Sequence, residues 1–160
     1  MRRKDRQVTD HRAIEEILKE CKTCRLAMVD KGQPYVVALS YGYTLESGKL
    51  TLVFHSAHEG RKISILKENS AVCFEISCEG EASFSEKTAC DYGYYYRSVI
   101  GFGNAGFVEE YEEKAKALTL ITEHQAGVKA EFTIKQTNTV AVLKVQTTDF
   151  SGKMKVMERT

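Results

Sequence analysis

Short apolar runs separated by turn residues fill the first half of the chain, and their spacing restricts the fold more than any other feature. Residues 25–29, 34–43 and 49–54 have the composition of strands, and the segments 30–33 and 46–48 between them have the composition of tight turns. Pro34, the only proline, opens the second run, where a missing N–H group costs a sheet little. Because such short connections join antiparallel neighbours, the pattern predicts antiparallel strands rather than a parallel sheet.

Helical patterns precede and interrupt these strands. Asp10 stands where it would cap a helix over residues 10–21, whose apolar residues fall on one face. Ser56 and Glu59 have the spacing of a capping box, which predicts that a short helix begins there. Residues 109–123 predict a further helix. We expect the remaining strands at 71–76, 94–108 and 140–145, a polar loop at 77–89 and a polar tail from 149.

The charge balance excludes some classes of protein. The 160 residues carry 23 basic and 22 acidic side chains, which is too even for a protein that binds the nucleic-acid backbone. The basic start lacks the apolar run of a signal peptide, and no stretch has the length of a membrane-spanning helix. We therefore expect a cytoplasmic protein without nucleic-acid or membrane partners. No linker or repeat divides it, which predicts a single domain over residues 1–160 with a core of about 10–148.

Five cysteines, Cys21, Cys24, Cys73, Cys78 and Cys90, are an odd number in a chain without an export signal, and this favours reduced thiols over a disulfide framework. Cys21 and Cys24 form a CxxC pair, yet no second pair follows that would complete a zinc site. The pair ends a helix and enters a strand, unlike a thioredoxin motif. We interpret both as packing residues at that junction, and we expect no metal site.

Residues 54–62 combine features that attract a phosphate group. The start of a helix presents unpaired N–H groups and partial positive charge. Arg61 and Lys62 would lie in the first turn, where cations disfavour the helix itself unless an anion is bound. Gly60 would allow a close approach of the backbone. From these residues alone, a solvated basic pair on a surface helix explains the pattern equally well.

Two strand-like segments also have features of a binding surface. The run 34–43 carries the small residues Ala38 and Ser40, so it would fit against a flat ring, although alone it is more typical of a core. In the segment 92–103, four of the eight tyrosines fall within five residues. Strand alternation would place aromatic side chains on both faces, and such clusters occur at interfaces, at stacked ligands and in cores.

Short motifs along the chain, taken together in this order, resemble those of a known family. The matching motifs are GQPYVV at 32–37, FHSA at 54–57, EGRKI at 59–63, VCFEI at 72–76 and YRSVIGFG at 96–103. They resemble the FMN-binding split-barrel family related to pyridoxamine 5'-phosphate oxidase, closest to its nitroimidazole-resistance (Nim-like) branch. The resemblance covers roughly residues 10–145. It implies a mostly β fold, a six-stranded antiparallel barrel with flanking helices, and a homodimer with FMN at the interface.

The resemblance also assigns roles to residues. Arg61 and Lys62 match the positions that hold the FMN phosphate, and the strand from Val36 to Ser40 would lie along the isoalloxazine ring. Ser98 and Val99 would contact the flavin from the partner subunit. The predicted cofactor-binding residues are Val36, Val37, Ala38, Leu39, Ser40, His55, Ser56, Arg61, Lys62, Ser98 and Val99.

His55 matches a histidine on the substrate side of the pocket and is the candidate catalytic residue. From the residues alone, a histidine at the end of an apolar strand is more often a hydrogen-bonded structural residue. Phe150 replaces a tryptophan found in many relatives, so the substrate implied by the branch name does not transfer automatically.

The leading functional prediction is an FMN-dependent oxidoreductase acting on a small molecule, with nitroaromatic compounds as one candidate class. One alternative is a flavin carrier or sensor without turnover. Another is a different ligand in the same groove, such as deazaflavin or haem, for which His55, His58 and His124 are the candidate axial ligands. FMN is favoured over FAD by the resemblance, and no dinucleotide-binding fingerprint is present.

Overall fold

The computed structural model describes residues 3–83 and 92–155, and in these residues nine strands form one sheet in which every strand pair is antiparallel. The strands are β1 (Gln7–Val8), β2 (Thr23–Asp30), β3 (Gln33–Ser40), β4 (Gly42–Glu46), β5 (Lys49–Ser56), β6 (Ala71–Ser83), β7 (Gly93–Val108), β8 (Ala141–Thr147) and β9 (Phe150–Lys155). Their main path runs β3-β2-β6-β7-β8-β5-β4, and β9 pairs with both β1 and β7.

A one-residue connection joins the two end strands of the sheet. β3 and β4 stand at the two ends of the strand order, yet only Tyr41 separates them in sequence. The two ends must therefore come close together, although they do not pair, and the result is a barrel that is split between β3 and β4. The Tyr41 side chain is fully buried, and its hydroxyl donates to the backbone oxygens of Leu18 and Cys21, both at 2.8 Å.

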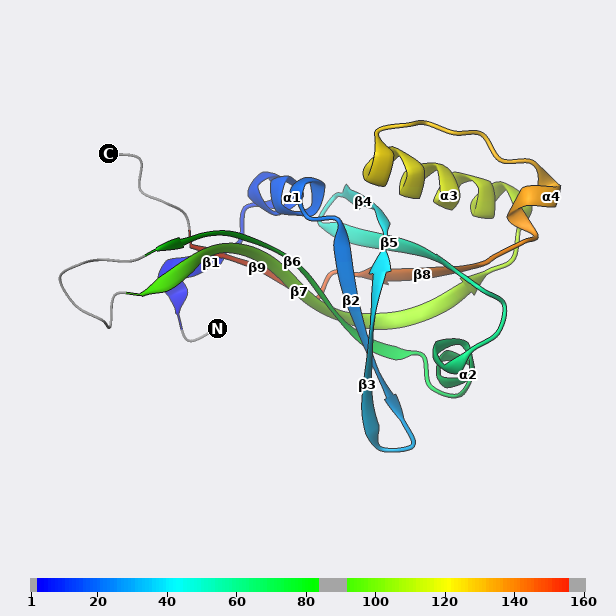
Figure 1. The fold of residues 1–160 in the computed structure, drawn as a ribbon, viewed down its shortest axis with the longest axis horizontal. Helices are drawn as coiled ribbons and strands as arrows, with labels where there is room; N and C mark the ends of the chain where they lie inside the picture. The colour runs from blue at the N-terminus through cyan, green and yellow to red at the C-terminus, as the bar shows by residue number, and fades with distance from the viewer. Residues whose placement is uncertain (1–2, 84–91, 156–160) are drawn as a thin grey trace.

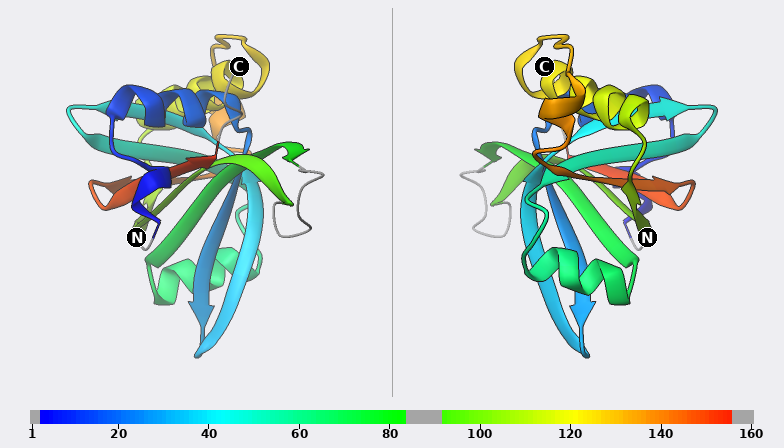
Figure 2. Two further views of the ribbon diagram at one scale, coloured as in Figure 1. Left: turned by 90° about the vertical axis from the view of Figure 1, so that its left-hand side faces the viewer. Right: turned by 90° about the vertical axis from the view of Figure 1, so that its right-hand side faces the viewer.

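Helices lie on both sides of this barrel. The α-helices are α1 (His11–Glu20), α2 (Arg61–Glu68), α3 (Tyr111–Ala126) and the short α4 (Ile134–Thr137), and a 3-10 turn, η1 (Lys4–Arg6), precedes β1. Figure 1 shows α1 and α3 on one side, and α2 on the other side beside the β2–β3 hairpin, a position that Figure 2 shows again from two further directions. Within the described residues, no helix is both long and apolar enough to cross a membrane.

Two apolar clusters hold these layers together. The larger cluster fills the barrel and includes Leu26, Phe54 and Phe74, each fully buried. The smaller one lies under α3, where Leu118 and Ile121 pack against the other face of β5 and β8. β5 therefore buries side chains on both of its faces, which explains the continuous apolar run at residues 52–54 in its middle.

Several predicted elements are confirmed and others are wrong at their ends. Asp10 caps α1, since its carboxylate accepts from the Ala13 N–H at 2.8 Å. The predicted capping box is wrong, because Ser56 is the last residue of β5 and α2 begins only after Gly60. The polar loop predicted from residue 77 is wrong as far as Ser83, where β6 ends, and its continuation to residue 89 lies outside the described residues. The polar tail is also wrong, because β9 pairs with β7 there. The single strand predicted at 34–43 is divided at Tyr41 into β3 and β4, and with β1 and β9 the sheet has nine strands instead of the six expected.

The prediction of reduced thiols is wrong for two cysteines, because Cys21 and Cys78 form a disulfide with a Cα–Cα distance of 5.3 Å. The disulfide joins the end of α1 to β6. The odd number of cysteines excluded only a structure in which every cysteine is paired. Cys24 and Cys73 are free, and Cys90 lies outside the described residues. Burial raises the pKa of the Cys24 thiol to about 12, so Cys24 is an unreactive packing residue, as predicted.

The disulfide yields the first prediction. It joins residues 57 positions apart, and closing a loop of that length in the unfolded chain corresponds to about 4 kcal/mol of stability. We expect Cys78→Ser to lower the midpoint of thermal unfolding under non-reducing conditions, and reductant to lower the wild-type midpoint similarly. The matched control is Cys73→Ser, which removes a free thiol. Equal midpoints for the two variants would show that the disulfide does not stabilise the fold.

The Tyr41 corner yields the second prediction. Tyr41→Phe removes the hydroxyl from the Leu18 oxygen and one of the two donors from the Cys21 oxygen, which also accepts from His124. We expect a loss of about 1–3 kcal/mol in the free energy of unfolding. Tyr43→Phe is the control, because the half-buried Tyr43 hydroxyl donates to no described residue. Urea unfolding followed by circular dichroism measures both. A Tyr41→Phe variant no less stable than the control would contradict the role given to this corner.

Candidate functional site

The start of α2 is built to receive a negatively charged group. Gly60 is its N-cap, no side chain caps this end, and the Gly60 oxygen accepts from the N–H groups of Ile63 and Ser64 at 3.0 and 3.1 Å. Gly60 has a φ of +126°, a conformation that favours glycine, and an added Cβ would meet nothing within 4 Å. The helix therefore begins with free N–H groups below open space, and Arg61 and Lys62 lie in its first turn.

Arg61 is held in place by the β2–β3 hairpin. Its Nε donates to the Asp30 carboxylate at 2.9 Å, and its guanidinium carbon lies 4.5 Å from the centre of the Tyr35 ring. A guanidinium group has five N–H donors, so the contact with Asp30 leaves others for a ligand. The hairpin thus orients a partly exposed arginine at the start of α2.

Ser56 carries a buried polar atom that lacks a partner. It ends β5 on the face that also carries the buried Phe54, and its Oγ makes no hydrogen bond to any described residue. Leaving a buried hydroxyl unpaired costs about 1–3 kcal/mol. Ser56 thus has an unused donor and acceptor, four residues before Gly60 in sequence.

β3 supplies a free backbone edge. It pairs with β2 along its whole length and with no other strand of the described chain. Its side chains alternate: Val36, Ala38 and Ser40 are exposed, whereas Val37 and Leu39 are half-buried against the barrel. The N–H and C=O groups on its outer edge are therefore available to the polar rim of a ring. Together with the start of α2 and Ser56, these residues fit a cofactor with a phosphate group and a flat ring, as in FMN.

Strand alternation separates His55 from this group of residues. His55 is exposed and points to the face of β5 opposite Ser56. There it lines a mainly apolar cavity of 330 Å³, formed with α3 and the segment before β8. Neighbouring residues of one strand cannot both direct their side chains to a ligand on one face. The catalytic role of His55 stays a prediction.

Ser98 and Val99 lie on β7, and two strands, β2 and β6, separate β7 from β3 in the sheet order. The Val99 side chain is fully buried in the barrel, so only its backbone is available to a ligand. Ser98 lies on the outer face, where its hydroxyl donates to the Lys153 oxygen at 3.4 Å. Within one protomer these two residues do not join the group around α2, and their predicted contact with the flavin would need a second copy of the chain.

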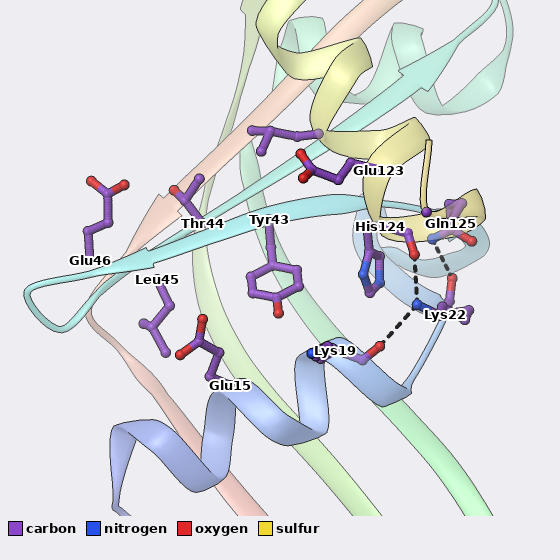
Figure 3. Close-up of a pocket in the computed structure, with 12 residues that line it drawn as sticks. Glu15, Lys19, Lys22, Tyr43, Thr44, Leu45, Glu46, Glu123, His124 and Gln125 are labelled. Atoms are coloured by element: carbon purple, nitrogen blue, oxygen red, sulfur yellow. Dashed lines mark hydrogen bonds between the residues drawn. The ribbon is translucent and has the colours of Figure 1, made fainter. Parts of the chain in front are cut away.

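A cavity of 660 Å³ that the sequence did not predict lies between α1, β4 and the end of α3 (Figure 3). The Lys22 side chain lies at the edge of this cavity, where its Nζ donates to the backbone oxygens of Lys19 and His124 at 3.0 and 2.7 Å. The His124 ring packs edge-on against Tyr43, with ring centres 5.2 Å apart. Burial, helped by the charge of Lys22, lowers the pKa of His124, so the ring is neutral near pH 7.

The three histidines named as candidate haem ligands are not brought together. His124 directs Nε2 to the Cys21 oxygen at 3.2 Å, and His58 directs Nε2 to the Asn138 oxygen at 3.0 Å. A carbonyl only accepts, so each of these nitrogens carries its proton and is not free to bind iron. The three side chains line three different cavities. The geometry therefore does not support His58 or His124 as a haem ligand through its Nε2 atom.

The sequence also matches a known family. Residues 10–154 match the family described as pyridoxamine 5'-phosphate oxidase. The chain belongs to this family. A comparison with curated proteins gives no match.

Solved structures agree with this assignment. A protein from Bacteroides thetaiotaomicron, provisionally named a 5-nitroimidazole antibiotic resistance protein, is 30% identical, with a TM-score of 0.80 over 92% of this chain and 86% of that one. The FAD- and haem-binding protein of Mycobacterium smegmatis is 18% identical, with a TM-score of 0.78 over 95% of this chain and 74% of that one. The flavocytochrome Anf3 of Azotobacter vinelandii is 17% identical, with a TM-score of 0.79 over 98% and 72%. The predicted fold class, a mostly β split barrel with flanking helices, is confirmed.

Proposed function

We propose that this protein binds FMN and acts as a flavin-dependent oxidoreductase on a small molecule. The observation that carries the proposal is the start of α2, where an uncapped helix end and two basic residues occur together. Ser56, four residues before Gly60 in sequence, adds a hydroxyl without a partner among the described residues. Membership of the pyridoxamine 5'-phosphate oxidase family supports it. So does the flavin named in the descriptions of two neighbours of the same fold.

Each part of the site has a task in this proposal. The first-turn N–H groups of α2, with Arg61 and Lys62, bind and neutralise the phosphate. Asp30 and Tyr35 hold Arg61 ready, so that little side-chain freedom is lost on binding. The outer edge of β3 orients the ring through backbone groups. FMN, when bound, supplies the exchange of electrons with donor and acceptor that no side chain of the protein provides.

Nitroaromatic compounds are the substrate class that we propose first, because the 30% identical neighbour is provisionally named for nitroimidazole resistance. His55 is the candidate residue to hold or donate a proton. The position of His55, on the other face of β5 from Ser56, favours the alternative of a flavin carrier without turnover. Anaerobic mixing of the reduced holoprotein with a nitroimidazole separates the two, because only the enzyme returns flavin to its oxidised spectrum in step with loss of the nitro compound.

We also propose that a second copy of the chain covers the open face, which is the outer surface of β3, β2, β6 and β7. Val36, Ala27, Cys73 and Phe102 are cross-strand neighbours and form one apolar row across it. Val36 is 59% exposed and Phe102 is 54% exposed. Exposed apolar rows of this kind mark interaction surfaces. Ser98 lies on the same face, so a homodimer would place it against the partner.

The third prediction tests the phosphate site. We expect the Arg61→Ala, Lys62→Ala double variant to bind FMN at least tenfold more weakly than wild type, because charge-assisted hydrogen bonds to the phosphate are lost. Flavin fluorescence quenching measures the affinity. Riboflavin, which lacks the phosphate, provides a second arm: the wild type should prefer FMN, and the double variant should bind both ligands equally.

Lys116→Ala is the matched control, because Lys116 is an exposed lysine of α3 outside this site. It should bind FMN as the wild type does. Circular dichroism checks that all variants fold. Undiminished FMN binding by the double variant would place the phosphate elsewhere, and absence of FMN binding by the wild type would remove the proposed function.

The fourth prediction concerns the homodimer. We expect Phe102→Glu to shift the protein from dimer to monomer in light scattering, because it places a charge at the β7 end of the apolar row, on its larger exposed ring. Ile134→Glu is the control, since Ile134 is equally exposed but lies on α4, away from this face. A wild-type monomer, or a Phe102→Glu variant that stays dimeric, would contradict the open face as the interface.

A further inference from the structure

Cys21 connects four parts of the molecule. It is the C-cap of α1, and its sulfur forms the disulfide with Cys78 of β6. Its backbone oxygen accepts from the Tyr41 hydroxyl at 2.8 Å and from Nε2 of His124 at 3.2 Å. Tyr41 is the corner between β3 and β4, and His124 lies in the last turn of α3. Because the sulfur and the oxygen belong to one residue, a change at the disulfide reaches the corner directly.

This corner borders the proposed flavin site. Tyr41 directly follows Ser40, the last residue of β3, and β3 is the strand whose outer edge orients the ring in the proposed function. Ser40 pairs with Thr23, the first residue of β2, which follows Cys21 by two positions. The end of β3 is thus held beside Cys21 in two ways, through the Tyr41 hydroxyl and through the start of β2.

The two sulfurs of the disulfide differ in exposure. Cys21 is fully buried, whereas Cys78 is half-buried. A thiolate of a dithiol reductant therefore meets Cys78 first and bonds to its sulfur. The bond between Cys21 and Cys78 breaks, and the Cys21 sulfur leaves with the electron pair and takes up a proton. The second thiolate of the reductant then displaces the Cys78 sulfur, which is protonated in turn, so two electrons and two protons pass from the dithiol to the protein.

Other contacts keep α1 in place when this bond opens. The apolar face of α1, which includes Ile17 and Leu18, is buried in the barrel core. Beside the disulfide, Nη1 of Arg97 donates to the carboxylate of Glu20, and Arg97 is the cross-strand neighbour of Cys78. Reduction therefore frees the end of α1 without releasing the helix, and its effect is concentrated at the corner.

We propose that the disulfide between Cys21 and Cys78 is a redox switch that sets the affinity of the protein for its flavin. In the disulfide form, the Cys21 oxygen fixes the Tyr41 hydroxyl and the end of β3, so flavin binding has little chain to order. In the dithiol form this end of β3 has more freedom, which the flavin must remove on binding, and the affinity falls. The switch rests on the proposed FMN function and adds control of that site by a dithiol reductant.

FMN titration of the two redox forms of the full chain tests the proposal. One sample keeps the disulfide and the other is reduced with dithiothreitol, and alkylation with mass spectrometry identifies the free thiols in each. Flavin fluorescence quenching measures the dissociation constant. We expect the dithiol form to bind FMN about fivefold more weakly or worse, as is usual for coupled sites. By linkage, bound FMN should shift the exchange equilibrium with dithiothreitol toward the protein disulfide by the same factor.

Two variants test the route from the disulfide to the flavin site. Cys78→Ser cannot form the disulfide, so it should bind FMN as the dithiol form does and should not respond to reductant, although the free thiols of Cys24 and Cys73 remain. Tyr41→Phe lacks the hydroxyl that contacts the Cys21 oxygen, so the two redox forms should differ less in FMN affinity than those of the wild type. Circular dichroism checks that both variants fold.

The outcomes separate the switch from the function on which it rests. Equal FMN affinity of the two wild-type redox forms would leave the FMN function intact and overturn the switch. A response to reductant that persists in Cys78→Ser would come from another cysteine and would also overturn it. No FMN binding by either form would remove the proposed function together with the switch. If a variant does not fold, the comparison of the wild-type forms decides.

Discussion

The architecture depends on the corner at Tyr41 and Gly42, where the chain passes from one end of the sheet to the other. The Tyr41 hydroxyl, buried and hydrogen-bonded to two backbone oxygens at the end of α1, fixes this crossing from one side. α3 fixes it from the other side, since a Cβ on Gly42 would lie 2.6 Å from the Ile121 nitrogen. No larger residue fits there without moving the helix. Closing the barrel at this corner leaves β3 as an edge without a strand partner.

That unpaired edge explains why the candidate site lies where it does. An edge strand exposes backbone donors and acceptors that must be covered by solvent, a ligand or another chain. The hairpin that carries this edge also holds Arg61 through Asp30 and Tyr35, so the start of α2 and the edge of β3 form one preorganised unit. The apolar row on the open face adds a second uncovered surface to the same strands. The free edge of β3 and the exposed apolar row both follow from the strand order, which leaves β3 at one end of the sheet.

The sequence predicted the parts of this structure that depend on local patterns. Apolar runs and turn residues located most strands, and Asp10 marked the start of α1 correctly. β9 was missed because its alternation is weak: Phe150 and Met154 pack against the core, but Gly152 between them has no side chain, and the pairing partners of β9 lie far away in sequence. The disulfide was missed for the same reason, since nothing local relates Cys21 to Cys78. The cavity beside His124 also arises only when α3 packs on the barrel.

For the candidate site, strand alternation in the sequence already separates His55 from Ser56. His55 and Ser56 are neighbours at the end of a strand, and a period of two already places their side chains on opposite faces. The spacing of Ser56 and Glu59 suggested a helix cap instead, and this assigned the serine hydroxyl to the helix. The buried, unpartnered Oγ shows that it is free for another partner.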